Sequence, residues 1–133
     1  MERESPSPKP WEASDEEAVE LCREWMVYLG AVDTVVASGA TRLLCDLYSS
    51  LYVAWVDNRQ GNLDVDVVEK AASLASADGR RALIFVTGGV RPVAQDLADA
   101  LGVALLRYGA HGGDLDGANT LGRQLHTLRL NSE

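Results

Sequence analysis

Apolar residues recur every three or four positions in three stretches of the chain, the spacing that places them on one side of an α-helix. The first stretch covers residues 15–29, the second residues 64–78 and the third residues 92–101. Each stretch is followed directly by a glycine, the residue most often found where a helix ends. The pattern therefore predicts three amphipathic helices, each buried along one face.

The first of these helices has a clear start signal. Ser14 is followed three residues later by Glu17, the spacing of a capping box, and the intervening acidic residues favour the positive end of the helix dipole. Residues 1–13 contain three of the four prolines and no periodicity. We therefore expect a flexible leader over residues 1–13 and one domain over residues 14–130.

Strand signals lie between the helices. Short β-branched or apolar runs predict strands at residues 32–36, 42–48, 51–57, 82–86 and 103–108. Turn residues separate them at Ser38–Ala40 and Arg59–Asn62, and His111–Gly113 is expected to be a loop. Residues 115–128 read as one closing helix.

The order of these elements predicts the fold class. A helix precedes three consecutive strands, and strands then alternate with helices to the end of the chain. Consecutive strands favour an antiparallel meander, whereas strand–helix–strand units favour right-handed crossovers and parallel pairing. The expected fold is α/β, with a mixed sheet and helices on both of its faces.

This order resembles the Mrr-like branch of the restriction-endonuclease fold, within the PD-(D/E)xK nuclease superfamily. The resemblance covers residues 15–128 and rests on four local segments. Leu29-Gly30 ends the first helix, residues 44–47 stand where the family has Gly-Ile-Asp, residues 85–89 match its Thr-containing turn, and residues 102–105 match its last crossover strand.

The resemblance implies a metal-dependent nuclease site. In active members the first acid, here Asp46, binds a divalent cation, while an acid or Gln and a Lys one residue apart on the next strand complete the site. Ala54 and Val56 occupy those two positions, and Asp57 belongs to the opposite strand face. The resemblance thus implies a degenerate nuclease fold that acts by binding, with no cofactor.

Two alternatives stay open at this site. Asp46 with Glu69 and Lys70 of the following helix would form a migrated site, making the protein an active Mg²⁺-dependent DNA endonuclease. The opposing interpretation is that Asp46 pairs with Arg42 or Arg59, and that Glu69 and Lys70 belong to a solvated helix face.

The net charge of the chain bears on whether its partner is a protein or a nucleic acid. The 133 residues carry a net charge of −8, which argues against binding nucleic acid by charge alone. Local cationic residues, Arg42, Arg59 and Arg91, remain candidates for binding. Arg91 follows Thr87-Gly88-Gly89, which is either an anion-binding turn or a plain strand–helix connection. A protein partner is favoured over nucleic acid, and self-association is left open.

The remaining composition favours a cytoplasmic protein. No apolar run reaches the roughly 18 residues of a membrane-spanning helix, and no secretory signal is evident. Cys22 and Cys45 are isolated in apolar surroundings and are expected to be reduced core residues. Trp25 and Trp55 are expected in the core for the same reason.

Overall fold

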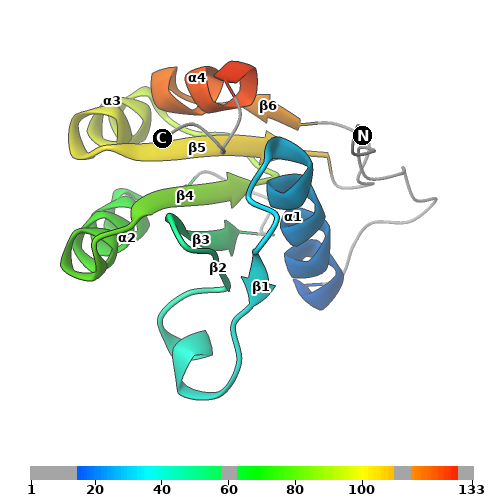
Figure 1. Ribbon diagram of the computed structural model, residues 1–133. Helices are drawn as coiled ribbons and strands as arrows, with labels where there is room; N and C mark the ends of the chain where they lie inside the picture. The colour runs from blue at the N-terminus through cyan, green and yellow to red at the C-terminus, as the bar shows by residue number, and fades with distance from the viewer. Residues whose placement is uncertain (1–14, 58–62, 110–114, 129–133) are drawn as a thin grey trace.

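A computed structural model describes residues 15–57, 63–109 and 115–128 (Figure 1). Within these ranges a six-stranded sheet carries four α-helices and one short 3-10 helix. The elements in chain order are α1 (Asp15–Leu29), β1 (Val35–Val36), η1 (Gly39–Leu43), β2 (Leu47–Tyr48), β3 (Tyr52–Asp57), α2 (Val65–Asp78), β4 (Arg81–Val86), α3 (Pro92–Leu101), β5 (Val103–Tyr108), β6 (Leu115–Gly117) and α4 (Thr120–Leu128).

The strands lie in the sheet in the order in which they occur along the chain, β1-β2-β3-β4-β5-β6. The first three form an antiparallel meander, in which Leu47 pairs with Ala54. β3, β4 and β5 are parallel, because α2 and α3 each carry the chain from the end of one strand back to the edge of the sheet at which the next strand begins. β6 then pairs antiparallel with β5. The expected mixed α/β sheet is therefore confirmed.

Helices cover both faces of the sheet, and each face has its own apolar core. α1 packs on one face over side chains such as Leu83 and Phe85, and α4 turns Leu121 and Leu125 towards the same core. α2 and α3 pack side by side on the other face, over residues that include Ile84. Alternating side chains of β4 enter the two cores in turn, as expected of a strand buried on both sides.

Most element boundaries agree with the sequence pattern. The structure confirms the helices that were expected at residues 15–29, 64–78 and 92–101, and the strands at 51–57, 82–86 and 103–108, to within a residue. Both cysteines are buried and free, and Trp25 is in the core. The leader, the Ser14 cap, the Arg59–Asn62 turn and the His111–Gly113 loop lie outside the described residues.

The predicted strand at residues 42–48 is wrong over most of its length. Gly39 adopts a positive φ of 57° and the chain curls into η1, with the N–H groups of Leu44 and Cys45 both donating to the Thr41 carbonyl oxygen. Strand pairing begins only at Leu47, directly after Asp46. The apolar run that favoured a strand places Leu43 at the surface instead. The first strand, expected at residues 32–36, is likewise reduced to Val35–Val36.

The single closing helix expected at residues 115–128 is also wrong. Its first three residues form β6, and the helix begins only at Thr120. Asn119 explains the break, because its side chain accepts a hydrogen bond of 2.8 Å from the Gly122 N–H, the bond of a helix N-cap. The pattern concealed the break because Leu115, Ala118 and Leu125 fit helical spacing by coincidence.

The Asn119 side chain also continues the β5 hydrogen-bond ladder where β6 ends. Its Oδ1 accepts from the Leu105 N–H at 2.9 Å, and its Nδ2 donates to the Val103 carbonyl at 2.8 Å. The Leu105 carbonyl accepts from the Ala118 N–H. A buried amide side chain thus stands in for a strand over this part of β5 and joins α4 to the sheet.

One polar contact links the loop before β1 to the turn between β2 and β3. Asp33 accepts hydrogen bonds from the Ser50 hydroxyl and from the Ser50 N–H, the latter at 2.9 Å. These bonds, the hydroxyl bond first, lower the pKa of Asp33 below its ordinary value of 3.8. The carboxylate therefore stabilises the fold above that value and loses its contribution as the pH falls through the lowered pKa.

We predict that the stability difference between the wild type and Asp33→Ala depends on pH. The wild type is expected to have the higher melting temperature at about pH 7, and the gap is expected to close as the pH falls below 3.8 and through the lowered pKa of Asp33, because the carboxylate is then protonated. Thermal unfolding of both proteins across this range measures the gap. A gap that widens in acid would contradict the assignment.

Candidate functional site

Asp46 lies where the β2–β3 hairpin opens, and protein groups bind both of its carboxylate oxygens. Arg42 Nε donates to Oδ1 at 3.1 Å, and the Val56 N–H donates to Oδ2 at 2.7 Å. The side chain is three-quarters buried, at 24% exposure. Of the two pairings left open by the sequence, the structure therefore shows the one with Arg42; Arg59 lies outside the described residues.

The bond to Val56 replaces a missing rung of the sheet. The pairing of Leu47 with Ala54 would, if continued, place Cys45 opposite Val56. Instead the Asp46 N–H donates to the Ala54 carbonyl, which shifts the hydrogen-bond register of the chain by one residue. The Val56 N–H then donates to the Asp46 carboxylate. Asp46 thus completes backbone hydrogen bonding that curling of the preceding segment would leave unsatisfied.

Arg42 connects Asp46 to the first helix. Its Nη2 donates to Glu16 of α1 at 3.0 Å, so one guanidinium joins two carboxylates from distant parts of the chain. Asp46 also lies close enough to Cys22 of α1 to add to the effect of burial, and both raise the pKa of that thiol well above its ordinary value. These contacts place the Asp46 carboxylate on the α1 side of the sheet.

The neighbouring strand, β3, carries apolar side chains at the positions where active nucleases of the family that the chain resembles have metal ligands. Ala54 is fully buried in the α1-side core, and Val56 packs against that core. Neither side chain has an atom that binds a metal ion or polarises water. The surroundings of Asp46 on this face therefore serve packing and hydrogen bonding.

The alternative partners of Asp46 lie elsewhere. Glu69 and Lys70 are exposed on α2, on the opposite side of the sheet, where they line a hollow together with Trp55. The described parts of the chain contain no group of three or more His, Cys, Asp or Glu side chains placed to hold a metal ion. The structure thus separates the Asp46 carboxylate from the two helix residues.

The remaining cationic candidate, Arg91, is exposed at the N-cap of α3. Of the turn that precedes it, the Gly88 carbonyl accepts from Arg107 and the Gly89 carbonyl accepts from the Leu63 N–H. These bonds are those of a strand–helix connection held within the fold, and anion binding at Arg91 stays a prediction.

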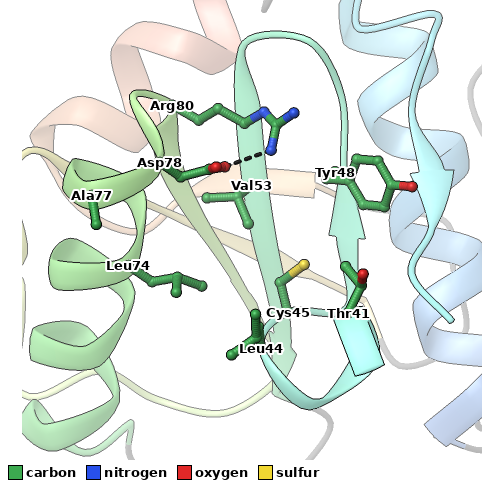
Figure 2. Close-up of a pocket in the computed structure, with 9 residues that line it drawn as sticks. All are labelled: Thr41, Leu44, Cys45, Tyr48, Val53, Leu74, Ala77, Asp78 and Arg80. Atoms are coloured by element: carbon green, nitrogen blue, oxygen red, sulfur yellow. Dashed lines mark hydrogen bonds and ion pairs between the residues drawn. The ribbon is translucent and has the colours of Figure 1, made fainter. Parts of the chain in front are cut away.

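A groove that the sequence did not reveal runs along α2 on the other side of the sheet. It consists of two adjoining hollows of about 470 and about 770 Å³, which share Leu44, Leu74 and Ala77. The α2 flank forms one wall and the segment from Thr41 to Tyr48 forms the other. Val53 and Trp55 of β3 form the floor between them, as Figure 2 shows for Val53 in the smaller hollow.

The smaller hollow is polar at one end and apolar at the other. Arg80 and Asp78 form an ion pair at the polar end, and the guanidinium lies 5.7 Å from the centre of the Tyr48 ring (Figure 2). Leu44, Leu74 and the Cys45 thiol lie at the apolar end. Burial, followed by the nearby Asp46 charge, raises the pKa of Cys45. The thiol is therefore protonated at neutral pH and contributes an apolar surface.

Two features of the larger hollow were not predicted from the sequence. Trp55, expected in the core, is only half-buried, and its indole N–H donates to the Leu44 carbonyl at 2.8 Å. Leu43 and Leu44 are 88% and 56% exposed. The apolar spacing gave no signal for their exposure, because consecutive apolar residues are equally typical of a strand that is buried on both faces, such as β4.

Comparison of the chain with protein-family models, curated proteins and solved structures finds no match. Among the described helices, none combines the length and the apolar character required to cross a membrane.

Proposed function

We propose that this protein is a catalytically degenerate member of the restriction-endonuclease-like fold and acts as a binding module, with a protein as its partner. The order of the strands supports the fold. The β2–β3 hairpin lies beside β4, the first strand reached by a crossover, and the acidic residue stands at the start of that hairpin. This is the arrangement on which the resemblance to Mrr-like nucleases depends.

The occupation of the Asp46 carboxylate carries the proposal. One oxygen accepts from Arg42 and the other from the Val56 N–H, so a cation would compete with bonds that the fold itself uses. The adjacent Ala54 and Val56 supply no replacement ligand. An acid in this position therefore supports the structure, and the nuclease fold is left with recognition as its function.

Charge favours a protein over nucleic acid as the partner. The net charge of −8 repels phosphate backbones, and the Arg42 guanidinium is engaged by Glu16 and Asp46. We place the protein in the cytoplasm, where its two buried thiols stay reduced.

A cleavage assay combined with an unfolding assay tests this proposal. We expect no cleavage of DNA with Mg²⁺ or Mn²⁺, and no retardation of DNA at low salt. Asp46→Ala is expected to lose about 1–2 kcal/mol of unfolding free energy, because it leaves the Val56 N–H and the Nε–H of Arg42 without their acceptor.

Glu20→Ala serves as the control. It removes the ion pair of Glu20 with Arg23 on the exposed side of α1, and is expected to cost less than about 0.5 kcal/mol. Metal-dependent cleavage that Asp46→Ala abolishes would overturn the proposal in favour of an active nuclease. An Asp46→Ala variant as stable as the wild type would remove its structural basis.

A further inference from the structure

We draw no further inference here: the strongest candidate, the groove along α2, is lined by charged side chains whose charges cancel, and nothing in the described part of the structure shows what covers it.

Discussion

Gly122→Ala is expected to be strongly destabilising, with a loss of at least about 3 kcal/mol of unfolding free energy. A Cβ atom added to Gly122 would overlap the carbonyl oxygen of Leu105 and lie 2.9 Å from its carbonyl carbon. Both are backbone atoms of β5, a central part of the fold, and they cannot rotate aside as a flexible side chain would. α4 would have to leave the sheet.

Denaturant unfolding of Gly122→Ala and Gly79→Ala makes the comparison. Gly79 ends α2 with a positive φ of 74° and has open space around the site of the new atom. Its replacement should therefore cost only the backbone strain, about 1–2 kcal/mol. Equal losses for the two variants would show that the contact between α4 and β5 is less close than the structure indicates.

Asn119→Ala is expected to cost about 3 kcal/mol or more, because it removes three side-chain hydrogen bonds at a site that is 1% exposed. The N–H groups of Leu105 and Gly122 would lose their acceptor, and the Val103 carbonyl would lose its donor. The helix would lose its cap at the same time. Unfolding measured by circular dichroism gives the size of the loss.

Asn119→Asp separates hydrogen bonding from packing, since the two side chains have nearly the same shape. The carboxylate keeps both acceptor bonds but turns an oxygen towards the Val103 carbonyl, so its protonated form is favoured in the fold. A raised pKa in the folded state makes this variant more stable as the pH falls, the opposite of the effect of Asp33. A stability that rises with pH would refute the assignment of the amide orientation.

Most of the fold could be predicted from the sequence where the spacing of the apolar residues agrees with the residues that start and end an element. The residues 92–101 begin at a proline and are followed by Gly102, which takes the positive φ of a helix end, and the helix has those bounds. The continuous apolar run at residues 82–86 similarly marked a strand buried on both faces. In these elements every local preference agrees with the tertiary structure.

The errors fall where a side chain replaces backbone pairing. Asp46 supplies the acceptor that a longer β2 would have supplied, and Asn119 does the same for a longer β6. Because neither exchange alters the apolar spacing, the sequence pattern predicted a strand over residues 42–48 and a single helix over residues 115–128. The groove was missed for a related reason, since it depends on how the segment that contains η1 curls beside α2.

The position of Asn119 also matters for the behaviour of the protein at high concentration. A strand edge with unpaired N–H and carbonyl groups is a template on which another chain can add a strand and begin to aggregate. β6 protects only the second half of β5, and the Asn119 side chain protects the first half with a single residue. At the other end of the sheet, β1 is only two residues long. Within the described residues, the sheet therefore offers little unpaired edge on which another chain could add a strand.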